Sequence, residues 1–217
     1  MTWRDLALLD RAVLGDPPEV VAPRLLGALL VTAEVTTRVV EVEAYGPDDP
    51  ASHSIRGRTP GNATMFGKPG HLYVYVSYGV HQLGNVTVLP QGTGAAVLLR
   101  SIEVVAGEEV ALRRRGGHDR PRPRWLGGGP GRLGQVLDLR TERDDGLDLL
   151  AEDSRVTLRT DGFKVAQVAT GPRVGVTAAP EVPWRFWLPE HPSVSRYTRS
   201  PRATRAPRAP HAGPPSG

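Results

Sequence analysis

The chain has 217 residues, a length that fits one domain with a substantial core. It contains no cysteine, which excludes disulfides and thiolate zinc sites, and no apolar run approaches the roughly 18 residues that a membrane-spanning helix needs. The N-terminus lacks the apolar region of a signal peptide, so we expect a cytoplasmic protein with no membrane partner.

The formal net charge of +4 originates at the C-terminal end. No acidic residue follows Glu190, and residues 196–217 carry five of the 27 basic residues, so the remainder is close to neutral. The basic pI is therefore no evidence that the folded body binds nucleic acid. We predict a domain over residues 1–198 and a disordered Arg/Pro/Ala-rich tail over 199–217, either solvated or in contact with a nucleic acid.

The N-terminal residues predict two helices. A capping box at residues 2–5, followed by apolar residues at helical spacing, predicts a first helix that ends at Gly15. Asp16-Pro17 is typical of a helix start and predicts a second helix that extends toward Leu26.

The rest of the chain alternates between strand patterns and loops. Segments rich in Val, Thr and Leu predict strands over residues 28–31, 36–45, 71–78, 82–89 and 95–104, with two or three more over 155–178. The Gly/Pro-rich residues 51–70 predict a loop, and residues 106–112 and 132–139 predict helices.

An arginine-rich segment occupies residues 113–124. Six arginines there face a single acid, Asp119. The segment is either a loop that contacts phosphates or a disordered insertion, and the composition slightly favours the insertion.

The strand over residues 36–45 carries two carboxylates. Alternate residues of a strand share a face, so the apolar residues at 40, 42 and 44 are expected to face the core. Glu41, Glu43 and Tyr45 would then line the opposite face. Taken alone, this pattern is more typical of a half-exposed strand with solvated acids than of a catalytic site.

Tyrosines are concentrated next to these carboxylates. Four of the five fall within residues 45–78, namely Tyr45, Tyr73, Tyr75 and Tyr78. Tyr73 and Tyr75 share one face of their strand, and Tyr78 lies on the other, directly before Gly79. Such a run is often core packing, but aromatic rings also stack purine bases and bind cationic alkylated purines.

Histidines provide no metal motif. His53, His71 and His81 lie near Asp48 and Asp49 in the sequence, but none of the familiar ligand spacings is present. A single loop histidine such as His53 is usually a surface residue. We therefore expect neither a metal nor another cofactor.

Residues 40–100 contain a dense succession of motifs. They are Val40-Glu41-Val42-Glu43-Ala44-Tyr45, Asp48-Asp49-x-Ala51-Ser52-His53, Thr59-Pro60-x-Asn62-x-x-Met65-Phe66-Gly67-x-Pro69-Gly70, Leu72-Tyr73-Val74-Tyr75-x-x-Tyr78-Gly79, Asn85-Val86 and Ala96-Val97-Leu98-Leu99-Arg100, with weaker matches at Gly129-Pro130-Gly131, Gly171-Pro172-Arg173-Val174-Gly175 and Trp184-Arg185-Phe186. This succession, which extends from about residue 8 to 190, resembles the alkyladenine (3-methyladenine) DNA glycosylase family.

The resemblance implies a fold and a reaction. The fold would be a single α+β domain with a curved, mainly antiparallel, open-barrel-like sheet flanked by helices. The protein would be a monomeric hydrolase of base excision repair that acts on double-stranded DNA and removes 3-methyladenine, 7-methylguanine and, as further candidates, hypoxanthine or ethenoadenine. Lys68 matches no catalytic position and residues 39–67 contain no lysine, so no Schiff-base lyase step is expected.

The resemblance also implies roles for individual residues. Glu43 matches the general base that activates water against the anomeric carbon of the sugar. Tyr45, His53 and Tyr75 match pocket residues that stack on or bond to the flipped base. Asn85 matches a residue that rejects the guanine 2-amino group.

Two further matches concern the DNA. Tyr78 matches the side chain that enters the duplex, and Arg100 matches an arginine near the DNA backbone and the pocket. Gly61 stands where the family pattern has an arginine, so a phosphate contact would be absent, and Val80 would leave Tyr78 to act largely alone. These departures concern DNA affinity more than chemistry.

Two functions of other classes remain open on the residues alone. A metal-dependent hydrolase could use Glu41, Glu43, His53 and Asp48. A non-catalytic protein that binds damaged DNA or RNA could use the tyrosine surface. Loss of activity in a chelator would favour the first, and binding without base release would favour the second.

Overall fold

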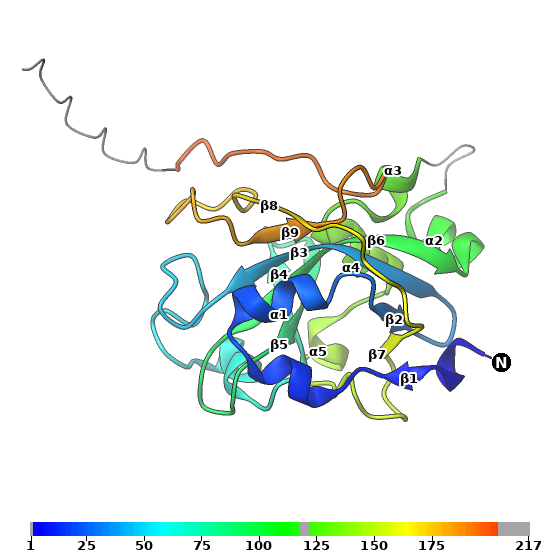
Figure 1. The fold of residues 1–217 in the computed structure, drawn as a ribbon, viewed down its shortest axis with the longest axis horizontal. Helices are drawn as coiled ribbons and strands as arrows, with labels where there is room; N and C mark the ends of the chain where they lie inside the picture. Colours follow the sequence, from blue (N-terminus) through cyan, green and yellow to red (C-terminus); the bar gives the residue numbers. More distant parts are fainter. Residues whose placement is uncertain (1, 118–121, 204–217) are drawn as a thin grey trace, which may run out of the picture.

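The computed structural model describes residues 2–117 and 122–203, and within them the chain forms one antiparallel sheet with short helices around it (Figure 1). The strands are β1 (Ala7–Leu8), β2 (Leu29–Val31), β3 (Thr36–Tyr45), β4 (Leu72–Ser77), β5 (His81–Thr87), β6 (Ala96–Ala106), β7 (Thr157–Thr160), β8 (Ala169–Gly171) and β9 (Arg185–Trp187). Their order is β1-β7-β2-β3-β6-β5-β4, and β9 pairs with both β3 and β8. The sheet ends at β1 and β4 and is not closed.

The helices lie against this sheet. They are α1 (Pro18–Arg24), α2 (Glu108–Arg114), α3 (Pro123–Gly127), α4 (Pro130–Val136) and α5 (Thr141–Asp144), with 3-10 turns η1 (Trp3–Asp5), η2 (Arg11–Gly15) and η3 (Pro60–Phe66). α1 packs against β3, and α4 packs against β5 and β6. The predicted α+β class with a mainly antiparallel sheet is confirmed.

Two glycines allow helices to approach the sheet backbone. A Cβ at Gly134 of α4 would lie 1.9 Å from the carbonyl oxygen of Gln82 in β5. A Cβ at Gly127 of α3 would lie 2.1 Å from the carbonyl oxygen of Ile102 in β6. Both distances are far below van der Waals separation, so larger side chains would push α3 and α4 away from the sheet.

β3 is the central strand, and it is buried along almost its whole length. β6 pairs along one edge. The other edge pairs with β2 at Thr36–Arg38 and with β9 at Glu41–Glu43. The β3–β6 register is irregular between Val39 and Val42. Because strands cover both edges and side chains cover both faces, the two glutamates are buried, and the interpretation of this strand as half-exposed with solvated acids is wrong.

The first predicted helix is wrong. Residues 2–15 form η1, β1 and η2, because Ala7 and Leu8 pair with Thr160 and Arg159 of β7. This partner strand is distant in the sequence, and local spacing cannot reveal it. The second helix is confirmed as α1, and the strand predicted over 36–45 has those bounds in the structure.

Other differences concern short elements. The predicted loop over 51–70 contains η3, and α3, α5 and β9 were not predicted. The favoured disordered insertion at 113–124 is wrong for the described part, since α2 extends to Arg114 and α3 begins at Pro123. Residues 118–121, and the predicted tail beyond residue 203, lie outside the described residues.

None of the helices in the described ranges is long and apolar enough to cross a membrane.

Candidate active site

A small cavity opens among β3, β4, β5 and β6 and the segment that follows β3. Its volume is about 80 Å³, and it is lined by Tyr45, Ala51, His53, Met65, Tyr73, Tyr75, Asn85 and Ala96. All four residues that the sequence assigned to a base pocket, Tyr45, His53, Tyr75 and Asn85, are among them. The fold therefore brings together side chains that lie on separate strands and on a loop.

Aromatic rings form one wall of this cavity. Tyr73 and Tyr75 stack with ring centroids 5.5 Å apart, and His53 meets the Tyr75 ring edge-on at 4.5 Å. His53 Nδ1 is 3.0 Å from Tyr73 Oη. Burial lowers the pKa of His53, so the imidazole is neutral at neutral pH. Burial and the nearby Glu43 raise the pKa of Tyr75 to about 12, so its ring is neutral as well.

Glu43 is fully buried next to Tyr45 and does not itself line the cavity. Its Oε1 accepts a hydrogen bond from the backbone N–H of Val174 at 2.7 Å. Its Oε2 accepts one from Tyr45 Oη at 2.9 Å and lies 3.2 Å from Arg100 Nη1. A carboxylate has about four lone-pair positions, so three donors leave room for one more, such as a water.

Glu41 shares the strand face with Glu43 but has a different environment. Its oxygens accept bonds from Arg100 Nε (2.9 Å), Arg185 Nε (2.7 Å), Ser101 Oγ (2.5 Å) and both the N–H and Oγ of Ser195 (2.7 Å each). Burial would raise the pKa of Glu41, but the two arginines outweigh it and lower this pKa to about 2. These donors saturate the carboxylate, so Glu41 has a structural role and Glu43 retains an open position.

Arg100 bridges the two carboxylates. It is buried, with Nε on Glu41 and Nη1 on Glu43. Burial would lower the pKa of Arg100, but Glu43 and Glu41 together raise it, so the guanidinium stays charged. The structure places Arg100 next to Glu43, outside the lining of the cavity, and only 5% exposed.

A second buried arginine supports Tyr45. Arg173 pairs with Asp49, donates to the carbonyl of Ala44 at 3.0 Å, and lies 4.7 Å from the centre of the Tyr45 ring and 5.6 Å from that of Trp184.

Among the residues of this site that had no role predicted from the sequence are Arg173, Val174, Arg185, Ser195 and Ser101. The first three lie in the weak motifs at 171–175 and 184–186, which were the available signal.

Tyr78 occupies the tip of the β4–β5 hairpin. Ser77 pairs with His81, and the residues between them form the turn. Tyr78 has φ 51°, a conformation that bulky residues seldom adopt, and the residue is 94% exposed. Val80 is 72% exposed. An exposed aromatic ring on a strained turn is a candidate for function, because neither packing nor backbone preference explains it.

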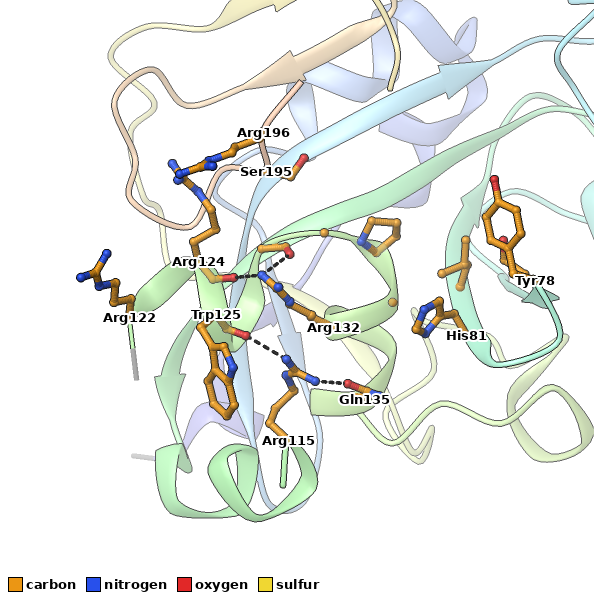
Figure 2. A pocket seen from close by; sticks show the side chains of 16 residues that line it. Tyr78, His81, Arg115, Arg122, Arg124, Trp125, Arg132, Gln135, Ser195 and Arg196 are labelled. Atoms are coloured by element: carbon orange, nitrogen blue, oxygen red, sulfur yellow. Dashed lines mark hydrogen bonds between the residues drawn. The ribbon is translucent and has the colours of Figure 1, made fainter. Parts of the chain in front are cut away.

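A wide groove of about 870 Å³ begins beside this hairpin. Figure 2 shows Tyr78 and His81 on one side and arginines of the α2–α4 region on the other. The C-terminal segment contributes Ser195 and Arg196. This arginine groove comprises Ser77, Tyr78, His81, Leu83, Arg115, Arg122, Arg124, Trp125, residues 128–132, Gln135, Ser195 and Arg196.

The metal-dependent alternative needed a shared site for Glu41, Glu43, His53 and Asp48. The two glutamates instead bind arginines and backbone or hydroxyl donors, and His53 contacts tyrosines. Within residues 2–117 and 122–203 no group of three or more His, Asp or Glu side chains is arranged to hold a metal ion.

Known proteins of one family are similar to this chain over most of its length. The family model described as methylpurine-DNA glycosylase (MPG) matches residues 12–192. A protein of Nocardia farcinica named "Putative 3-methyladenine DNA glycosylase" is 50% identical over 196 residues, which cover 86% of this chain and 89% of the relative. Proteins of the same name from Mycobacterium leprae and Corynebacterium efficiens are 48% and 44% identical, covering 85% and 82% of this chain and 86% and 91% of the respective relatives.

The match spans the cavity, both buried glutamates, the hairpin tip and most of the arginine groove. The resemblance seen in the motifs of residues 40–100 is thus confirmed over most of the chain, and with it the predicted class of enzyme, a DNA N-glycosylase of base excision repair. The chain belongs to the methylpurine-DNA glycosylase family.

Proposed function

We propose that this enzyme flips an alkylated purine out of duplex DNA into the cavity beside Tyr45 and hydrolyses its N-glycosidic bond with a water activated by Glu43. The observation that carries the proposal is the hydrogen bond from Tyr45 Oη to Glu43 Oε2 at 2.9 Å. This bond joins Tyr45, on which a base would stack, to the carboxylate that would act at the sugar of the same nucleotide. No Asp or Glu is among the described residues that line the cavity itself. Glu43 is the carboxylate that is hydrogen-bonded to a residue of the lining, Tyr45.

The chemistry follows from the charge of the substrate. Cleavage passes through a sugar with oxocarbenium character. A base alkylated at a ring nitrogen is cationic and leaves as a neutral molecule, taking the electron pair of the glycosidic bond. The Glu43 carboxylate stabilises the cationic sugar and accepts the proton of the water whose oxygen bonds to the anomeric carbon. We therefore expect 3-methyladenine and 7-methylguanine as the main substrates. Hypoxanthine and ethenoadenine, which leave less readily, are secondary candidates.

The neutral state of the pocket suits a cationic base. Tyr45 and Tyr75 offer electron-rich faces, and stacking on such rings stabilises a cation. The neutral His53 in the lining of the cavity adds no competing positive charge. The guanidinium of Arg173 lies 4.7 Å from the centre of the Tyr45 ring, but its charge is balanced by the ion pair with Asp49.

The proposed function is tested by incubating the protein with duplexes that contain 3-methyladenine, 7-methylguanine, hypoxanthine or ethenoadenine. We expect released base together with alkali-labile abasic sites, greatest for the two cationic purines. Tight binding to these duplexes without any base release would instead support a non-catalytic damage-binding protein.

Tyr78→Ala is expected to lower base release from duplex DNA more than from single-stranded DNA carrying the same lesion. The exposed ring at the hairpin tip would fill the space that the flipped nucleotide leaves, which offsets part of an unstacking cost of a few kcal/mol. Single-turnover rates on the two substrates measure the difference. Equal losses on both would remove Tyr78 from this role.

Asn85→Ser is expected to relax discrimination against guanine-type bases. Asn85 is buried at the cavity, and its Nδ2 donates to the carbonyl of Tyr73 at 3.1 Å, which fixes the amide. A fixed side chain can disfavour a 2-amino group by steric clash, so that a guanine is released only when alkylation has made it a good leaving group, and a shorter side chain disfavours it less. The readout is the ratio of base release from duplexes containing 7-methylguanine and 3-methyladenine. An unchanged ratio would refute the assignment.

A further inference from the structure

We propose that the arginine groove binds the phosphodiester backbone of the duplex arm adjacent to the flipped nucleotide, which it holds in a fixed position relative to Glu43. This inference rests on the proposed function, since it takes damaged duplex DNA as the substrate. It adds to the hairpin residues of the motifs at 40–100 a set of residues outside those motifs, contributed by the α2–α4 region and the C-terminal segment at residues 195–196.

Among the described residues, no carboxylate balances the positive charge of the groove. Five arginines line it, namely Arg115, Arg122, Arg124, Arg132 and Arg196, and its described lining contains no Asp or Glu. None of the five forms an ion pair with a described carboxylate, whereas the buried arginines Arg100, Arg159 and Arg173 all do. The charge outside the tail is nearly balanced, so this local excess is a feature of the fold and not of the composition.

Several of these cations are held in place. Arg132 Nη1 donates to the carbonyls of Arg124 (2.6 Å) and Gly128 (3.3 Å). Arg115 donates to Gln135 Oε1 and to the carbonyl of Trp125 (3.1 Å), and its guanidinium lies 4.8 Å from the Trp125 ring centre. Figure 2 shows these bonds along one wall of the groove.

This fixed arrangement keeps like charges close together. Burial and the neighbouring Arg132 both lower the pKa of Arg115. Such repulsion is a cost in the unbound protein, and anions in the groove would relieve it. Guanidinium groups bind phosphate oxygens through paired hydrogen bonds, which suits this arrangement better than lysines would.

Buried and partly buried hydrogen bonds connect the groove to the active site. Ser195, on the C-terminal side of the groove, donates to Glu41 through both its N–H and its Oγ. Gly129, on the helical side, donates to Ser101 Oγ, which donates to the same carboxylate. Glu41 also holds Arg100 against Glu43. The buried carboxylate of Glu41 thus holds both sides of the groove and also Arg100, the ion-pair partner of Glu43.

The shape of the groove favours a polyanion over a single anion. It is wide, open to solvent, and extends from the hairpin tip at Tyr78 to Arg196. Five cations spread along such a surface match a series of phosphates better than one ion. Backbone contacts of this kind fix register and orientation without reading sequence.

The test is a triple variant, Arg122→Gln, Arg124→Gln and Arg196→Gln, compared with the single variant Arg113→Gln. The three target residues are exposed at the groove. Arg113 belongs to the same arginine run and is exposed on α2, but it does not line the groove. The probe is an undamaged duplex, with Kd measured over a range of salt concentrations, and thermal unfolding verifies that each variant is folded.

Removal of each arginine that binds a phosphate should reduce the slope of log Kobs against log salt by about 0.9, so the triple variant should reduce it by about 2.7. Arg113→Gln should change the slope far less and leave base release unchanged. With lesion-containing duplex, the triple variant should need a higher protein concentration for half-maximal base release.

An unchanged slope in the triple variant, or an equal effect of Arg113→Gln per charge removed, would overturn the proposal. If the parent protein releases no base, the proposed function fails, but the salt slopes still test the groove.

Discussion

Glu43→Gln is expected to lower single-turnover base release by at least about 10²-fold, the lower range for loss of a general base. Glutamine keeps the size of the side chain and an oxygen that can accept from the N–H of Val174, but it removes the charge and the basicity. Binding to lesion DNA should persist or improve, because stacking and phosphate binding are unaffected and one negative charge is gone. Measurement requires rates with enzyme in excess and a separate determination of Kd.

The comparison variant for this experiment needs care. Glu41→Gln is the choice that the sequence suggests, since the two glutamates share a strand face. The structure shows that Glu41 neutralises two buried arginines, so its loss also destabilises the fold. Glu103→Gln is a better control for removal of a carboxylate, because the side chain of Glu103 is 47% exposed. If folded Glu41→Gln proves inactive while Glu43→Gln retains near-normal rates, the general base is Glu41, which lies two residues earlier on β3.

Glu41→Gln is expected to reduce the free energy of unfolding by about 3–5 kcal/mol at neutral pH, the range for removing one partner of a buried ion pair. Arg100 and Arg185 would remain buried without their anion, and Ser195 would keep at most part of its bonds. Denaturant unfolding measures the loss. Glu103→Gln should change stability by less than about 0.5 kcal/mol. A loss at Glu41 as small as at Glu103 would contradict the central role of this carboxylate.

The same residue gives the protein an acid-sensitive component. The folded pKa of Glu41 is about 2, below its usual value of 4.5. A lowered carboxyl pKa contributes stability that is fully present above the unfolded value and is lost as the pH falls through the folded value, here roughly 3 kcal/mol. Unfolding free energies between about pH 6 and pH 3 should therefore decline less steeply in Glu41→Gln than in the parent protein. Parallel declines would assign the acid sensitivity to other groups.

Much of the site was accessible from the sequence because it lies on two nearly regular strands. Period-two alternation places Glu41, Glu43 and Tyr45 on one face of β3, and Tyr73 with Tyr75 on one face of β4. The motif succession then identified the family and nominated the cavity residues. The prediction of an N-terminal helix was wrong because the spacing of its apolar residues also suits 3-10 turns. The pairing of β1 with β7, a strand far along the chain, determines the structure of this segment.

The sequence by itself determined the strands that carry the site, the residue types on each face, the enzyme family, and the concentration of arginines at residues 113–124. The family resemblance assigned the base to Glu43, but only the tertiary structure gave the physical difference between Glu41 and Glu43, because donors that distinguish the two carboxylates come from residues 174, 185 and 195, far along the chain from β3. Only the tertiary structure assembled the groove, since α2, α3, α4, the β4–β5 hairpin and the C-terminal segment must converge before scattered arginines become one surface. Burial, pairing and local charge density depend on which distant segments meet, and a pattern of neighbours along the chain carries no information about that.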